Sequence, residues 1–114
     1  MSEASPIRFY VDAWTLRQRF RELRIYERLL AGELRAVVDR DYLAPASQRQ
    51  PEGTRSQRVL YYADGTQIAV AHQYVLPNGS LGASGLPDPK WLLDGDRILR
   101  LERPTTSAGS SPPV

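Results

Sequence analysis

The chain contains one histidine, His72, and no cysteine, so only one side chain normally titrates near neutral pH. His72 stands two residues before Tyr74, in a segment whose residues alternate as in a strand. Ser84, Asp88 and Lys90 follow on a loop that can fold over it. A metal-independent ribonuclease could use such residues. His72 would take a proton from a 2′-hydroxyl, and Lys90 would stabilise the charge developing on phosphorus. A structural histidine beside a tyrosine is the competing interpretation.

Other kinds of catalytic site find no support in the sequence. Without cysteine there are no thiol nucleophiles, disulfides or cysteine metal ligands, and one histidine cannot form a histidine-rich zinc site. Ser84 stands in Gly-Ala-Ser-Gly, which is not the G-x-S-x-G of a nucleophile elbow. No Walker lysine follows the glycines from Gly79 to Gly85. We therefore predict no metal site and no cofactor.

A row of arginines is the clearest indication of a binding surface. When residues 12–41 are placed on a helical wheel, five arginines fall in one stripe beside an apolar stripe. Such a row suits a phosphate backbone or an acidic protein surface. A solvated or internally paired face is the alternative, because 14 of the 15 cations in this chain are arginine. The row consists of Arg17, Arg21, Arg24, Arg28 and Arg35, bordered by Trp14, which could stack on a base or on a partner side chain.

A loop after this segment extends the basic region. Residues 43–57 contain prolines, a glycine and several polar residues, which is typical of a loop. Arg49 and Arg55 lie in it, with Glu52 as the only acid. Residues 1–58 hold 11 arginines against 8 acids, whereas residues 59–114 hold 4 cations against 5 acids. This asymmetry favours an anionic partner near the arginine row, although an ordinary exposed linker would have the same composition.

The arginine row requires a helix. Apolar residues recur at helical spacing from Leu16 to Val38, and the carboxylate of Asp12 can cap the first turn. A continuous helix over residues 13–40 would be about 42 Å long. Gly32 would cost it roughly 1 kcal/mol, which favours a bend there or a break into helices 13–31 and 33–42.

Strand patterns occur on both sides of this helical segment. Asp64-Gly65 is a two-residue hairpin signal, because a type I′ turn needs positive φ at both positions. Counting from this turn places His72 and Tyr74 on the face that the helix covers, with Tyr61 opposite Ile68 and Val59 opposite Val70. The predicted strands are 7–11, 58–62, 67–75 and 97–102, with a short return strand at Leu81 and a helical turn at 89–93.

These elements predict an α+β fold, with one long or Gly32-broken amphipathic helix packed on a small, mainly antiparallel sheet. Residues 1–104 would form a single domain, and the Ser/Pro/Gly-rich residues 105–114 a disordered tail. The N-terminus lacks the regions of a signal peptide and no apolar run approaches 18 residues, so we expect a cytoplasmic protein without a membrane segment. Because the apolar helix stripe can also seat on a second copy, a homodimer is an alternative.

The leading hypothesis is a small non-enzymatic accessory or regulatory binding protein. Its arginine-striped helix would contact an acidic partner, with DNA or RNA slightly preferred to protein. The predicted contacts are the arginine row, Arg49, Arg55 and Trp14. The first alternative is a small metal-independent ribonuclease or toxin-like enzyme that uses His72, Tyr74 and Lys90. The second is a protein–protein interaction module without nucleic acid.

Overall fold

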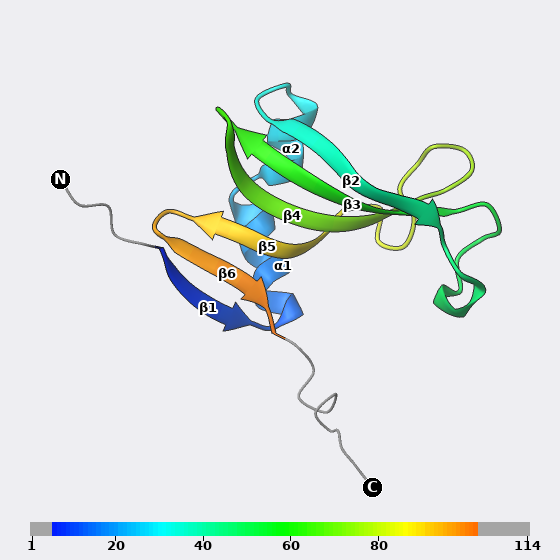
Figure 1. The fold of residues 1–114 in the computed structure, drawn as a ribbon, viewed down its shortest axis with the longest axis horizontal. Helices are drawn as coiled ribbons and strands as arrows, with labels where there is room; N and C mark the ends of the chain where they lie inside the picture. Colours follow the sequence, from blue (N-terminus) through cyan, green and yellow to red (C-terminus); the bar gives the residue numbers. More distant parts are fainter. Residues whose placement is uncertain (1–5, 103–114) are drawn as a thin grey trace, which may run out of the picture.

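Figure 1 shows one twisted sheet of six strands, with both helices on the same face. The computed structural model describes residues 6–102, and the tail predicted at 105–114 lies outside the described residues. In chain order the elements are β1 (Ile7–Val11), α1 (Ala13–Glu22), α2 (Ile25–Leu30), β2 (Arg35–Leu43), the 3-10 turn η1 (Ala46–Gln48), β3 (Arg55–Ala63), β4 (Thr66–Val75), β5 (Asp88–Asp94) and β6 (Arg97–Leu101). The strand order is β1-β6-β5-β4-β3-β2, and every neighbouring pair is antiparallel except β1 and β6.

The predicted fold, a long helix on a small sheet, is therefore wrong. The start of the helix is as expected, because the Thr15 N–H donates to Asp12 Oδ1 at 2.7 Å. However, α1 stops before Arg24, which takes a left-handed conformation with a φ of 55°. α2 then adds only six residues. The helical layer is thus two short segments joined at a bend, not one rod over residues 13–40.

Gly32 ends the helical layer completely. Its φ is +84°, a left-handed value that favours glycine. The Gly32 N–H donates to the Leu29 carbonyl at 3.0 Å, and the Glu33 N–H donates to the Arg28 carbonyl at 2.9 Å. These are the two hydrogen bonds of a Schellman motif, which satisfies the last carbonyls of a helix. The chain therefore turns back toward the sheet after Gly32.

The segment expected to form a second helix, 33–42, instead runs mostly in the edge strand β2. Two consecutive β-branched residues, Val37 and Val38, fit a pleated strand better than a helix. β2 pairs with β3 along its length, and Asp39 is an extra residue in β2 that has no partner in the pairing. Long-range pairing thus outweighs the helical spacing of the apolar residues.

The hairpin of β3 and β4 turns where predicted, but its register then shifts by one residue. Asp64 and Gly65 have φ values of 49° and 79°, as a type I′ turn requires. Just beyond the turn, Ile68 is an extra residue of β4 without a partner on β3. Such a bulge transfers every later side chain of β4 to the opposite face. Tyr61 pairs with Ala69, Val59 with Ala71 and Arg58 with His72, which corrects the predicted pairs with Ile68 and Val70.

This bulge decides which side chains lie beneath the helices. Ala69 and Ala71 are fully buried in the hydrophobic core with Tyr61. The Phe20 ring of α1 meets the Tyr61 ring edge to face, with centroids 6.1 Å apart. We call this side of the sheet the helix-covered face and the other side the open face. His72 lies on the open face, contrary to the prediction.

The segment before β6 also differs from its prediction. Residues 89–93, expected as a helical turn, belong to β5. Pro89 is the second residue of β5, close to the start of the strand, where the missing backbone N–H of a proline is tolerated. Lys90 follows as an extra residue without a partner on β4. Leu81, expected to begin a return strand, makes only an isolated bridge with Val75.

We expect Gly32→Ala to lower the free energy of unfolding by roughly 1 kcal/mol, because alanine is strained at positive φ. The added Cβ meets no atom within 4 Å, so the effect comes from the backbone conformation alone. Urea denaturation of both proteins measures it.

Arg24→Gly is the matched control with the opposite sign. Glycine relieves the left-handed strain at the bend between α1 and α2, and we expect a gain of roughly 0.5–1 kcal/mol. If Gly32→Ala stabilised the protein instead, the helix would continue through residue 32.

Candidate functional site

His72 lies near the end of β4 on the open face, where neighbouring side chains hold its ring. Its Nε2 and the Ser56 Oγ of β3 are 2.7 Å apart, and Ser56 is fully buried. The Tyr74 ring meets the imidazole edge to face, with centroids 4.6 Å apart. The imidazole is therefore fixed by one hydrogen bond and one aromatic contact. Sequence reasoning missed Ser56, since its role depends on the shifted register.

The surroundings of His72 favour its neutral form. Burial lowers the pKa of the imidazole below its usual 6.5, and the positive charge of Lys90 lowers it further. Asp88 acts in the opposite direction and does not cancel these effects. At pH 7 the imidazole is thus mostly uncharged. One ring nitrogen then carries a proton, and which one sets whether Nε2 donates to Ser56 or accepts from it.

A cleft of about 370 Å³ is lined both by residues of α1 and by His72. α1, the end of β4 and the loop before β5 form its walls. Ser84 of this loop and Asp88, the first residue of β5, thus line the same cleft as His72, together with two of the predicted arginines. We call it the helix-side cleft. Its charged and polar lining consists mainly of Arg17, Arg21, His72, Tyr74, Ser84 and Asp88.

Asp88 holds two cations at the edge of this cleft. The Arg17 Nε donates to its Oδ1 at 2.8 Å, and the Lys90 Nζ donates to its Oδ2 at 3.1 Å. Burial by itself would raise the pKa of the Asp88 carboxyl, but the hydrogen bonds from Arg17 and Lys90 outweigh it and lower the pKa. Asp88 is therefore ionised, and the cluster still carries one excess positive charge.

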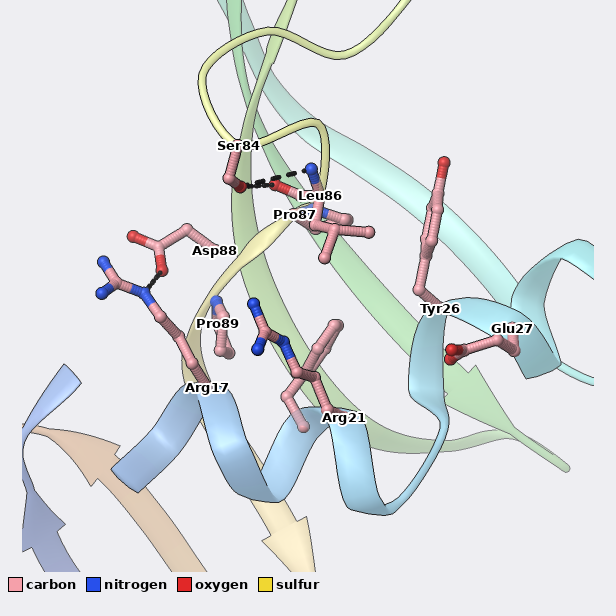
Figure 2. A pocket seen from close by; sticks show the side chains of 10 residues that line it. Arg17, Arg21, Tyr26, Glu27, Ser84, Leu86, Pro87, Asp88 and Pro89 are labelled. Atoms are coloured by element: carbon pink, nitrogen blue, oxygen red, sulfur yellow. Dashed lines mark hydrogen bonds and ion pairs between the residues drawn. The ribbon is translucent and has the colours of Figure 1, made fainter. Parts of the chain in front are cut away.

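Arg21 has no carboxylate partner within residues 6–102. Figure 2 shows Arg17 on the Asp88 carboxylate and Arg21 reaching from the same helix toward the segment 87–89. Arg21 also lines a small cavity of about 50 Å³ beside Tyr26 and Leu86. Its guanidinium is thus available to an anion that enters the helix-side cleft.

His72 and Tyr74 also line a second cleft, of about 390 Å³. We call it the strand-side cleft. Arg40 and Arg58 are directly opposite each other on β2 and β3, and Arg58 is directly opposite His72. Asp39 accepts hydrogen bonds from the Nε and Nη2 atoms of Arg58, which lower the pKa of its carboxyl. The strand-side cleft is lined by Arg40, Tyr42, Arg58, His72, Tyr74 and Lys90, among others.

The two clefts together form the candidate site. His72 and Tyr74 line both of them, and we call this shared boundary of the two cationic clefts the ridge. Five cations stand around the ridge, and two carboxylates are paired with them. The cations are Arg17, Arg21, Arg40, Arg58 and Lys90, and the carboxylates are Asp39 and Asp88.

The other predicted contact residues lie elsewhere. Arg24 occupies the bend between the helices, and Arg28 stands 3.6 Å from Glu33. Arg35 belongs to β2, with its guanidinium 5.6 Å from the centre of the Tyr62 ring. The predicted row is therefore not one continuous surface. Arg49 follows η1, Arg55 donates to Asp41 at 3.0 Å, and Trp14 lines a groove beside β1.

Arg40, Tyr42 and Arg58 are members of the site that sequence reasoning missed. Arg40 and Tyr42 alternate along β2, and their pattern would have been informative only if this segment had been recognised as a strand.

Within residues 6–102, no group of three histidine, aspartate or glutamate side chains could hold a metal ion. In the same range, no helix is long and apolar enough to cross a membrane. Comparison of the chain with protein-family models, curated proteins and solved structures yields no match. The site must therefore be interpreted from its own chemistry.

We expect the single imidazole to titrate with a midpoint below 6.5 when followed by NMR. In the unfolded chain the pKa returns to about 6.5, so the unfolded state binds more protons just below that pH. The free energy of unfolding should therefore fall as the pH is lowered through about 6.5, and this decline should end below the folded-state pKa. His72→Gln should remove this part of the pH dependence.

Two variants test the physical cause of that shift. Lys90→Gln removes a positive charge and should raise the midpoint, whereas Asp88→Asn removes a negative charge and should lower it. A midpoint above 6.5 in the parent protein would contradict this description of the site.

Proposed function

We propose that the protein is a non-enzymatic binding protein for single-stranded nucleic acid. The observation that carries this proposal is the ridge of His72 and Tyr74 between two cationic clefts. A polyanion that crosses the ridge would place one phosphate in each cleft, while a base lies against the aromatic side chains. Contacts to phosphate position such a ligand without reading its sequence.

The charges on the open face favour an anion in the strand-side cleft. Arg40 and Arg58 face each other across two strands, and like charges directly opposite are destabilising. Asp39 accepts hydrogen bonds from Arg58 and also attracts Arg40, but one carboxylate leaves this pair of arginines with one excess positive charge. A bound phosphate would supply the missing negative charge between them.

The helix-side cleft offers a second phosphate position. Arg21 is the principal donor there, because its guanidinium is not engaged by a carboxylate of the described chain. Arg17 would share its charge between Asp88 and the phosphate. The size of each cleft falls in the range of small-ligand pockets, roughly 300–1,000 Å³, which fits a nucleotide.

The aromatic residues favour a single strand over a duplex. Tyr74 and His72 stand between the clefts, and Tyr42 lines the strand-side cleft. Base–aromatic stacking contributes about 1–3 kcal/mol per base and requires bases that are not already stacked in a duplex. α1 also lies along the sheet and does not project as a helix that could enter a major groove.

We expect a fluorescent oligouridylate of about twelve nucleotides to bind in a salt-dependent manner. Log affinity should fall by about 0.7 per phosphate contact for each tenfold rise in salt. Arg21→Glu and Arg40→Glu should each weaken binding about five- to tenfold and reduce the salt slope by about one contact, as measured by fluorescence anisotropy.

Arg35→Glu is the matched control, since it makes the same charge change on β2 but lines neither cleft. It should bind the oligonucleotide nearly as well as the parent protein. Equal losses in all three variants would mean that only net charge matters. Binding that did not respond to salt would contradict the proposal.

A small metal-independent ribonuclease is the second candidate. It is favoured by one specific observation, that His72 lines the same clefts as Arg21, Arg40 and Lys90. A neutral imidazole at pH 7 could accept the proton of a 2′-hydroxyl, and the cations could stabilise the charge on phosphorus. The Ser56 hydroxyl, however, already engages Nε2.

Incubation of the purified protein with the same oligouridylate separates the two candidates. A non-enzymatic binding protein should leave the RNA intact after binding, both as the parent protein and as His72→Ala. Cleavage by the parent protein that disappears in His72→Ala would establish the ribonuclease and overturn the non-enzymatic function.

A further inference from the structure

The two edges of the sheet differ in how well they are protected against another strand. β2 is interrupted by the bulge at Asp39 and carries three consecutive charged residues, 39–41. Charges and bulges on an edge discourage further pairing. β1 has neither a bulge nor an acid, and it pairs only with β6 within residues 6–102. Its outer backbone groups are therefore open to another strand.

A groove runs beside β1 on the helix-covered face. Its volume is about 570 Å³, and α1, β1 and β6 form its walls. Trp14 of α1 is 67% exposed and Phe9 of β1 is 42% exposed, so two large aromatic side chains face water there. The groove can thus accept apolar side chains from a strand added to β1.

The charges at the rim of this groove are largely balanced. Asp94 accepts hydrogen bonds from Arg19 at 2.6 Å and from Arg97 at 3.1 Å, and Arg19 also donates to Glu22. The groove therefore combines an aromatic part at Phe9 and Trp14 with polar side chains whose charges are balanced, and the Arg97 guanidinium lies 5.9 Å from the centre of the Phe9 ring.

The opposite side of β1 is cationic. Arg8 and Tyr10 alternate with Phe9 and so lie on the open face. Arg100 of β6 stands beside them, with its guanidinium 5.9 Å from the centre of the Tyr10 ring. Neither Arg8 nor Arg100 forms an ion pair with a carboxylate within residues 6–102.

We propose that β1 receives an extended segment of a partner protein in which apolar residues alternate with acidic ones. The segment would pair with the open edge of β1 and extend the sheet by one strand. Because side chains alternate along a strand, its apolar residues would enter the groove at Phe9 and Trp14. Its acidic residues would lie on the open face beside Arg8 and Arg100.

Charge complementarity selects this occupant over a second copy of the chain. β1 contains an arginine and no acid, so pairing two copies through β1 would bring Arg8 and Arg100 of both molecules together without a counter-charge. An acidic strand supplies that counter-charge. None of the residues lining the groove lines the helix-side or strand-side cleft, so this site does not depend on the nucleic-acid proposal.

The test uses Trp14 as a reporter in a Trp91→Phe background, since the chain has two tryptophans. The probe is an acetylated, amidated peptide of alternating valine and glutamate, compared with its valine–lysine counterpart. We expect saturable binding of the glutamate peptide with a blue shift of Trp14 emission. The lysine peptide should bind at least about tenfold more weakly.

Two further comparisons isolate the edge pairing and the charges. Of the two alternate patterns of N-methylation, the one that removes the N–H groups facing β1 should abolish binding, and the other should not, because its methylated bonds point away from β1. Arg8→Glu combined with Arg100→Glu should weaken the glutamate peptide about tenfold and strengthen the lysine peptide, whereas Arg35→Glu should change neither.

Three outcomes would overturn the inference. They are equal binding of both peptides, binding that survives both patterns of N-methylation, and a Trp14 emission shift that depends on protein concentration alone. The last of these would identify a second copy as the occupant. The oligouridylate serves as an independent probe, so loss of peptide binding and loss of nucleic-acid binding are distinguishable.

Discussion

The register of β3 against β4 is the constraint on which the site depends. If β4 had no bulge at Ile68, the type I′ turn would place the side chains of Ile68, Val70 and His72 beneath the helices. With it, Ala69 and Ala71 lie there fully buried. Their small side chains leave room for the rings that join α1 to the sheet, and no imidazole has to be buried among apolar groups. The polar and aromatic residues at the end of β4 are thereby turned to the open face.

Local signals were enough to predict part of this fold. The Asp12 cap, the Asp64-Gly65 turn and the strands β1, β3, β4 and β6 depend mainly on residues that are close in sequence. β2 could not be predicted in this way, because Leu34 and Val38 fit helical spacing and only pairing with β3 makes the segment a strand. The bulge at Ile68 leaves no recognisable pattern, so the face of His72 could not be inferred from alternation alone.

The candidate site follows the same division. Arg17 and Arg21 are neighbours because α1 really is a helix over those residues, and the spacing of four holds. Beyond Arg24 a single helical wheel no longer gives the directions of the side chains, because the chain bends there and later forms a strand. Arg40 and Arg58 come together only through the pairing of β2 with β3, and no spacing along the chain relates them. Sequence could therefore indicate the arginines on one side of His72, but not those on the other.

α1 is the element that both proposed surfaces share, and its three sides have different roles. Leu16 and Phe20, four residues apart, are buried and fix its distance from the sheet. Arg17 and Arg21 follow on one flank and reach the helix-side cleft, whereas Trp14 and Gln18 line the groove beside β1. The carboxylate of Asp94 is mostly buried and binds both Arg19 and Arg97, so it ties the helix to the β5–β6 hairpin. An exposed ion pair contributes only about 0–1 kcal/mol, but removing one partner of a buried pair costs more, because the remaining charge must stay desolvated. The helix is thus held by apolar packing along its length and by one buried carboxylate beside it, which keeps the arginine flank and the aromatic flank in place at the same time.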